Sequence, residues 1–170
     1  MSSADTTLGA GAADLVLLGA TKINGTGNDG DNVIEGNRVG NVLSGGIGND
    51  TLIGGLGHDV LSGGSGNDVF DFNRVAESRA GAGIRDVISD FVIGQDKIDL
   101  FNIDANTLAA GNQDFKFIAS ALFHHIAGEL RFVQTAGHTI VAADVNGDGA
   151  TDFQLDLTGT LTLTKSDFVL

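Results

Sequence analysis

The sequence of 170 residues lacks cysteine, proline, tryptophan and tyrosine, and it contains only nine lysine and arginine residues. The absence of cysteine excludes a disulfide framework and a thiolate metal site, so a small extracellular domain of this composition needs another means of stabilisation. A bound metal ion is the means that remains. The formal net charge of −13 argues against a nucleic-acid partner and against anionic membrane surfaces, because both recruit basic patches.

A long apolar segment is also missing near the start. Residues 1–20 contain Asp5 and Asp14, no basic residue precedes Lys22, and the apolar run at residues 15–18 is short. This pattern predicts neither a Sec signal peptide nor a membrane span, so no membrane insertion is expected.

Glutamate is scarce, whereas aspartate and glycine are abundant: the chain has 19 aspartates, 3 glutamates and 26 glycines. Aspartate favours turns, while glutamate is the acid that suits solvated helices. The acidic residues are therefore expected in glycine-containing turns, where they could bind metal. Their charge opposes compaction unless a cation binds.

Apolar residues recur every nine positions in the first half, at Ile34, Leu43, Leu52, Leu61 and Phe70. This spacing fits neither a helix nor a strand and indicates a repeat. Copies at residues 45–53, 54–62 and 63–71 each read G-G-x-G-x-D-x-U-x, where U is apolar. The candidate metal-binding residues of these copies are Gly46, Gly48, Asp50, Gly55, Gly57, Asp59, Gly64, Gly66 and Asp68.

Two weaker copies precede them in the same register, at residues 27–35 and 36–44. Asparagine replaces the aspartate in both, and Val39 replaces a glycine in the second. Their candidate ligands, expected to be weaker, are Asn28, Gly30, Asn32, Asn37, Val39 and Asn41. A flexible Gly/Asn/Asp linker is the alternative, but its spacing would be irregular.

Each copy predicts a six-residue turn followed by a short strand, so that two copies form one coil of 18 residues. Turns 18 residues apart then stack on one edge, which pairs Asp50 with Asp68. A calcium ion between stacked turns would obtain its six to eight oxygen ligands from carboxylates and backbone carbonyls. Counting onward by nines adds Glu77 and Asp86 and predicts the pairs Asp59/Glu77 and Asp68/Asp86. The alternative that Glu77 and Asp86 are solvated loop acids stays open, because residues 78–85 do not resemble the repeat.

The second half contains conventional strand signals, and all ten phenylalanines lie at or beyond Phe70. Apolar residues alternate around residues 115–117, 130–132, 153–157 and 161–163, which predicts antiparallel strands. Helix candidates occur only at residues 104–110 and 120–126. Residues 144–152 match the first nine positions of an EF-hand-like loop without its final glutamate. A β-turn is favoured there, and weak calcium binding is left open.

The predicted fold class is all-β: a right-handed parallel β-roll of nonapeptide repeats, followed by an antiparallel strand-rich C-terminal region. Residues 1–26 are interpreted as an N-terminal strand segment or the start of the roll. Residues 27–85 are the predicted calcium-binding roll, and residues 86–170 a predicted β-rich C-terminal region.

The three full copies match the RTX (hemolysin-type) calcium-binding nonapeptide. Residues 86–91 and 94–100 resemble the segment that follows the roll in serralysin-type metalloproteases. The chain ends in Asp167, Phe168, Val169 and Leu170, which looks like the uncleaved tail of that family's type I secretion substrates. This resemblance implies that residues 86–170 are a secretion region and that several Ca²⁺ ions are bound. It also implies a type I secretion apparatus and an upstream passenger domain as partners, and an extracellular location outside a Gram-negative bacterium.

The sequence contains no H-E-x-x-H motif, so the protease part of such a protein is absent and no enzyme is expected. The chain more loosely resembles the R-modules of mannuronan C5-epimerases. That resemblance implies the alternative of an extracellular module that binds an alginate-like polysaccharide. The repeat half has no obvious basic track for a polyanion, although Arg74, Arg79, Arg85 and Lys97 could form a small patch.

Overall fold

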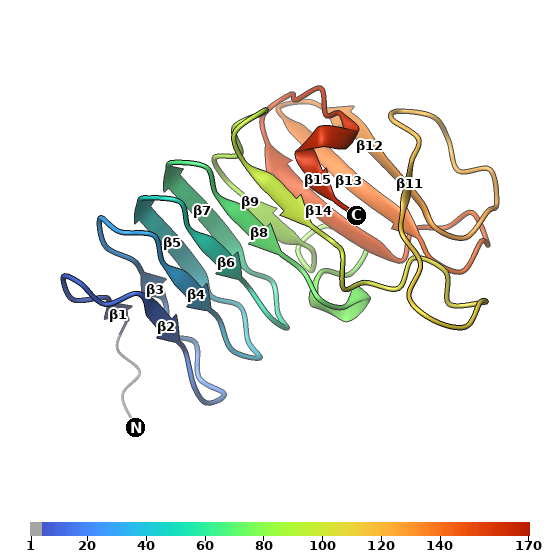
Figure 1. Ribbon diagram of the computed structural model, residues 1–170. Coiled ribbons are helices and arrows are strands. Elements are labelled where there is room, and N and C mark those ends of the chain that lie inside the picture. The colour runs from blue at the N-terminus through green and yellow to red at the C-terminus, as the bar shows by residue number, and fades with distance from the viewer. Residues whose placement is uncertain (1–4) are drawn as a thin grey trace.

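The computed structural model describes residues 5–170, which form fifteen β-strands and two short 3₁₀ helices. Over the first hundred residues, successive strands alternate between two parallel sheets (Figure 1), which confirms the predicted β-roll. In this part of the chain the first sheet contains β1 (Thr6–Thr7), β3 (Gly25–Thr26), β5 (Val42–Ile47), β7 (Val60–Ser65) and β9 (Asp86–Ile88). The second contains β2 (Asp14–Val16), β4 (Val33–Glu35), β6 (Thr51–Ile53), β8 (Val69–Asp71) and β10 (Lys97–Asp99).

The core of the roll consists of the apolar residues that recur every nine positions. Leu43 pairs with Leu61 in the first sheet, and Leu52 pairs with Phe70 in the second. The partners are one coil apart, so each coil contributes one apolar residue to each sheet, and all four side chains are fully buried. Because each coil buries so few apolar side chains, the turns must also contribute to stability.

The parallel stack does not end at residue 85, where the sequence analysis placed the end of the roll. Ile88 of β9 pairs with Leu61, and Ile98 of β10 pairs with Phe70. Residues 72–85 form an additional loop between β8 and β9, and this loop includes the 3₁₀ helix η1 (Val75–Glu77). The roll therefore contains one enlarged coil that a strict count by nines does not anticipate.

The C-terminal region extends both sheets of the roll. Strands β12 (Glu129–Thr135), β13 (His138–Asp144) and β14 (Phe153–Thr158) form an antiparallel meander, and β14 lies parallel beside β9. Strand β11 (Lys116–Phe117) is parallel to β12. After the 3₁₀ helix η2 (Lys165–Asp167), β15 (Phe168–Val169) lies parallel beside β10 (Figure 1). The antiparallel region and the parallel roll thus share continuous sheets.

Three predicted elements do not form. The strand expected at residues 161–163 is irregular, because the backbone of Leu161 bonds to side chains: its N–H donates to Thr139 Oγ1 at 2.7 Å. The helix expected at residues 104–110 is replaced by turns in which Asp104 Oδ1 and Asn106 Oδ1 accept nearby backbone N–H groups. Such local bonds compete with helix formation. Residues 120–126 are also irregular. Within residues 5–170, no helix is long and apolar enough to span a membrane.

Candidate calcium sites

The aspartates that end the turns form a row along each edge of the roll. On one edge, Asp50 N–H donates to Asp68 Oδ1 at 2.9 Å, and Asp68 N–H donates to Asp96 Oδ1 at 3.0 Å. On the other edge, Asp59 N–H donates to Asp86 Oδ1 at 2.8 Å. One oxygen of each accepting carboxylate therefore connects two coils, and the carboxylates of neighbouring coils are brought together.

The second carboxylate oxygen is buried without a hydrogen-bond partner in Asp50, Asp59, Asp68 and Asp86. An unsatisfied buried polar group costs about 1–3 kcal/mol, and a charged group costs more. A methyl group added at Gly45 would collide with Asp50 Oδ2 and would lie 2.5 Å from the carbonyl oxygen of Gly63. Oxygen atoms therefore converge with no hydrogen between them, and this donor set fits a hard cation such as calcium.

The buried carboxylates are held in surroundings that disfavour their charge. Burial raises the pKa of Asp59 to about 7 and that of Asp68 to about 6. Burial also raises the pKa of Asp86 to about 8, and the neighbouring charges of Asp59 and Glu77 add to the effect. A bound cation would remove this repulsion, whereas without one the two rows destabilise the roll.

We expect the calcium-free protein to lose stability as the pH rises from about 5 to about 8. The folded state raises the pKa values of Asp59, Asp68 and Asp86 above the ordinary 3.8, so it retains protons that the unfolded chain releases. This contribution is present at acidic pH and is lost as the pH passes through the raised values. The β-sheet circular dichroism that remains after calcium is removed by dialysis should be weaker at the higher pH; the opposite order would contradict the assignment.

The shape that the turns repeat depends on glycine. Gly66 has a φ of +144°, and a methyl group there would collide with the carbonyl oxygen of Gly48 in the preceding coil. Only glycine combines this backbone conformation with so close an approach. In the three full copies, all six glycines that the sequence predicted as metal-binding have positive φ: Gly46, Gly48, Gly55, Gly57, Gly64 and Gly66.

The two earlier turns belong to the same rows but have asparagine at the aspartate position. Asn32 N–H donates to Asp50 Oδ1 at 2.8 Å, and Asn41 N–H donates to Asp59 Oδ1 at 2.6 Å. Within these turns the N–H groups of Gly30 and Val39 donate to the Oδ1 atoms of Asn28 and Asn37, at 2.9 and 3.1 Å.

The prediction that Asp86 pairs with Asp68 is wrong. Asp86 lies 27 residues after Asp59 and on the same edge, because the loop at residues 72–85 adds nine residues to the coil. Asp96, which was not predicted, takes the place beside Asp68. The predicted pair Asp59/Glu77 does not form either, because Asp86 takes the place beside Asp59. Glu77 is buried in η1, where its carboxylate accepts the N–H of Asn73 at 2.8 Å, and its charge adds to the effect of burial in raising the pKa of Asp59.

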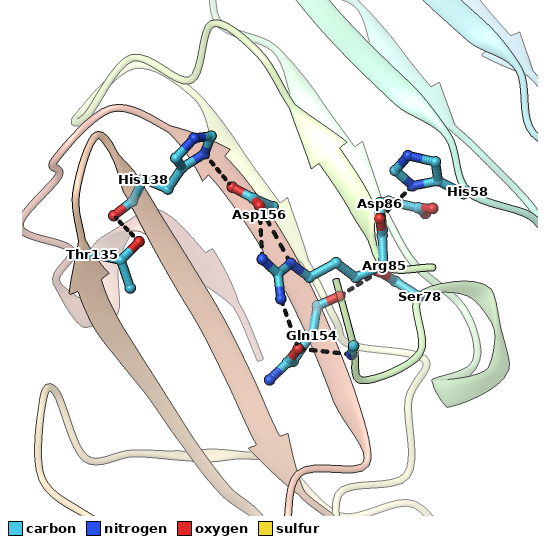
Figure 2. A network of polar contacts seen from close by, with 9 residues as sticks. His58, Ser78, Arg85, Asp86, Thr135, His138, Gln154 and Asp156 are labelled. Carbon is cyan, nitrogen blue, oxygen red and sulfur yellow. Dashed lines mark hydrogen bonds and ion pairs between the residues drawn. The ribbon is translucent and has the colours of Figure 1, made fainter. Parts of the chain in front are cut away.

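A polar network holds Asp86 against the C-terminal region (Figure 2). Asp86 N–H donates to Ser78 Oγ at 2.7 Å, and Ser78 Oγ donates to the carbonyl oxygen of Gln154. The adjacent Arg85 forms an ion pair with Asp156 at 2.9 Å and donates to Gln154 Oε1 at 3.2 Å. The last turn on this edge is thereby fixed to strand β14.

Within residues 5–170, no three histidine or acidic side chains form a group that could hold a metal ion. Backbone carbonyls would therefore have to supply part of any coordination. In the loop at residues 144–152, Asp144 is already satisfied by the N–H groups of Asn146, Gly147 and Gly149 at 3.2, 2.7 and 2.8 Å. These bonds support the β-turn interpretation of this loop.

The predicted secretion tail is packed into the fold. Asp167 is fully buried and accepts the N–H of Thr164 at 2.7 Å. The Phe168 ring lies 5.3 Å from that of Phe117 between centroids. Val169 and Leu170 follow at the end of the second sheet, where Leu170 packs against the core.

Comparison with solved structures gives two similar R-module subunits of the Azotobacter vinelandii mannuronan C5-epimerase. The solution structure of the AlgE6R3 subunit has a TM-score of 0.65 and 25% sequence identity, and the match covers 95% of this chain and 86% of that one. The AlgE6R2 subunit has a TM-score of 0.55 and 26% identity, with 100% and 90% of the two chains covered. Both neighbours agree with the β-roll fold and with the looser of the two resemblances.

Among curated proteins, no match was found. The family described as peptidase M10 serralysin C terminal matches residues 18–170. This match includes the repeats, the enlarged coil and the packed C-terminal tail, and it agrees with the resemblance carried by the segment after the roll. The chain therefore belongs to the peptidase M10 serralysin C-terminal family.

Proposed function

We propose that the chain is a calcium-binding module whose roll folds when calcium occupies the stacked aspartate turns. The observation that carries the proposal is the set of buried, unpartnered carboxylate oxygens of Asp50, Asp59, Asp68 and Asp86. With the carbonyls of the glycine turns, and with Glu77 close by, these groups would hold several ions. The calcium would supply the positive charge that offsets their repulsion.

The apolar core of the repeats is too small to make the roll stable without the metal, since each nine-residue copy contributes one large apolar side chain. At low calcium inside a cell, repulsion between the carboxylates would keep the chain unfolded and able to pass through an exporter. At a calcium concentration about 100 times the dissociation constant, each occupied site would add roughly 2.7 kcal/mol to stability. A few sites would then convert the unfolded ensemble into the roll.

The family match and the tail support export as the biological setting of this switch. The module would be carried out of a Gram-negative bacterium by a type I secretion apparatus that reads the C-terminal end. An upstream passenger domain of the same parent protein would follow it. Folding outside the cell would disfavour movement of the chain back into the exporter and would help the passenger to fold. The proposed role is non-enzymatic.

Deletion of Asp167, Phe168, Val169 and Leu170 should abolish secretion of a fused passenger by a type I apparatus. The expected readout is passenger retained in the cells rather than recovered from the medium. A full-length variant with both Asp59 and Asp68 replaced by alanine serves as the control, because it folds poorly but keeps the tail. Normal secretion of the deletion variant would contradict the assignment of the tail.

A second candidate function is binding of an acidic polysaccharide, which the similarity to epimerase R-modules suggests. A groove beside the second sheet contains Arg38 and Arg74, but Glu35 and Glu77 also line it. Of the basic patch considered from the sequence, Arg85 is paired with Asp156 and Lys97 Nζ donates to a carbonyl oxygen at 2.5 Å. Calorimetry with an oligomannuronate in saturating calcium separates the two functions, since heat of binding would favour this second one.

A further inference from the structure

The two turns that precede Asp50 share two differences from the later turns. In the copies at residues 45–53, 54–62 and 63–71, the second and sixth positions are glycine and aspartate. In the copies at residues 27–35 and 36–44, both positions are asparagine. The paired asparagines are Asn28 with Asn32 and Asn37 with Asn41. Because asparagine replaces both the glycine and the aspartate in each of these copies, the two asparagines of a turn are expected to act together.

The side-chain oxygen that has no hydrogen-bond partner in the aspartate turns accepts a hydrogen bond in the asparagine turns. A methyl group at Gly27 would approach Asn32 Oδ1 as one at Gly45 would approach Asp50 Oδ2, so these two oxygens are equivalent. Asp50 Oδ2 has no partner, whereas Asn32 Oδ1 accepts Asn28 N–H at 2.8 Å. The second copy repeats this bond.

The bond in the second copy joins Asn37 N–H to Asn41 Oδ1, also at 2.8 Å. Because these N–H groups fix the oxygen of each amide, the Nδ2 group must point the other way. Asn41 Nδ2 donates to the carbonyl oxygen of Ile23 at 2.6 Å, and Asn37 Nδ2 donates to that of Thr21 at 3.0 Å. The amides therefore reach back to the preceding coil.

The first asparagine turn makes the same kind of contact with the start of the roll. Asn28 Nδ2 donates to the carbonyl oxygens of Gly9 and Ala12 at 2.9 and 2.8 Å, and Asn32 Nδ2 donates to that of Ala12 at 3.2 Å. A neutral donor facing a carbonyl needs no cation, whereas a carboxylate in its place would set an acceptor against an acceptor. Both ends of these amides are thus satisfied within the protein.

We propose that the turns at residues 27–32 and 36–41 are calcium-independent joints, in which paired asparagine amides attach residues 5–26 to the roll. Calcium then occupies only the turns from Asp50 onward. This inference rests on the proposed function, and it replaces the expectation that the asparagine turns are weaker calcium sites. It also accounts for the exchange of both glycine and aspartate, since each asparagine of a turn donates its own Nδ2 group to a carbonyl oxygen of the preceding coil.

The double variant Asn28→Gly/Asn32→Asp restores the full G-G-x-G-x-D motif at residues 27–32 and tests the proposal. Native mass spectrometry in calcium should show one more bound ion per chain than in the wild type. In EGTA the variant should retain less β-sheet circular dichroism than the wild type, because amide bonds are lost and a buried charge is added. The same number of ions as in the wild type would overturn the proposal.

The single variant Asn32→Ala keeps the test decisive if the double variant does not fold. It should bind as many ions as the wild type, and loss of an ion would overturn the proposal. Asn112→Asp is the matched control for the double variant, because it removes an exposed amide-to-carbonyl bond of 2.8 Å outside the roll and adds the same charge. A wild-type protein that binds no calcium would refute the proposed function instead, while the loss of β-sheet signal from the double variant in EGTA would still test the amide joints.

Discussion

Replacement of Asp59 by asparagine is expected to change the stability of the roll in opposite directions with and without calcium. Asparagine keeps the oxygen that accepts Asn41 N–H at 2.6 Å and removes the negative charge. Without calcium, the variant should be more stable than the wild type, because burial and the nearby Glu77 charge oppose ionisation of Asp59, as its raised pKa of about 7 indicates. In calcium it should be less stable, because a carboxylate ligand is lost.

The loss in calcium should be large. One site saturated at about 100 times its dissociation constant contributes roughly 2.7 kcal/mol, which corresponds to a fall of about 5–10 °C for a chain of this size. The control is Asp29→Asn, because Asp29 is exposed in an asparagine turn and the charge change is the same. Differential scanning calorimetry gives the change in calcium, and the β-sheet circular dichroism that remains in EGTA gives the change without calcium. A shift in the same direction under both conditions would show that Asp59 is not a calcium ligand.

Replacement of Phe70 by alanine is expected to destabilise the calcium-loaded protein by about 3–5 kcal/mol. Phe70 is fully buried in β8, where it pairs with Leu52 of β6 and Ile98 of β10. Its ring lies 6.2 Å from the Phe91 ring between centroids. The residue therefore connects the regular repeats to the coil that follows the enlarged loop. The cost is large against a typical total stability of about 5–15 kcal/mol.

Urea unfolding in saturating calcium measures this loss. Phe101→Ala is the control, because the Phe101 side chain is 57% exposed and its removal should change stability by no more than about 0.5 kcal/mol. If the two variants had equal midpoints, the row of apolar residues would not be the core on which the roll depends. The calcium sites of Phe70→Ala should still fill once the chain is folded.

The roll could be predicted because one short pattern encodes both its core and its turns. The spacing of Leu43, Leu52, Leu61 and Phe70 fixes the apolar row of each sheet, and the aspartates between them fall on the two edges. The pairing of Asp50 with Asp68 follows from the same 18-residue coil. Because each copy follows the same local pattern, its structure depends little on contacts with residues far away in the sequence.

The register beyond Asp68 could not be obtained by counting, because the loop at residues 72–85 is held by contacts with β14 that no repeat encodes. Ser78 and Arg85 bond to Gln154, which is about 70 residues away in the sequence. A signal was nevertheless present: the Asp-Val-Leu-Ser that begins at Asp59 reappears as Asp-Val-Ile-Ser at Asp86. Aligning these segments would have assigned Asp86 to the edge of Asp59.

The C-terminal region was predicted less completely because its loops depend on specific side-chain bonds. Alternation located β12 and β14, but the parallel pairing of β14 with β9 and of β15 with β10 is a tertiary feature. The strand signal near Leu161 failed because Thr139 Oγ1 binds its backbone N–H. Periodicity gives the faces of a segment and not its partners.

Far-ultraviolet circular dichroism during a calcium titration tests the central claim most directly. The chain in EGTA should lack most of the β-sheet signal, and addition of calcium should restore it cooperatively, whereas magnesium at the same concentration should have little effect because it prefers a smaller octahedral site. A spectrum that is equally rich in β-structure in EGTA and in calcium would contradict a calcium-dependent roll.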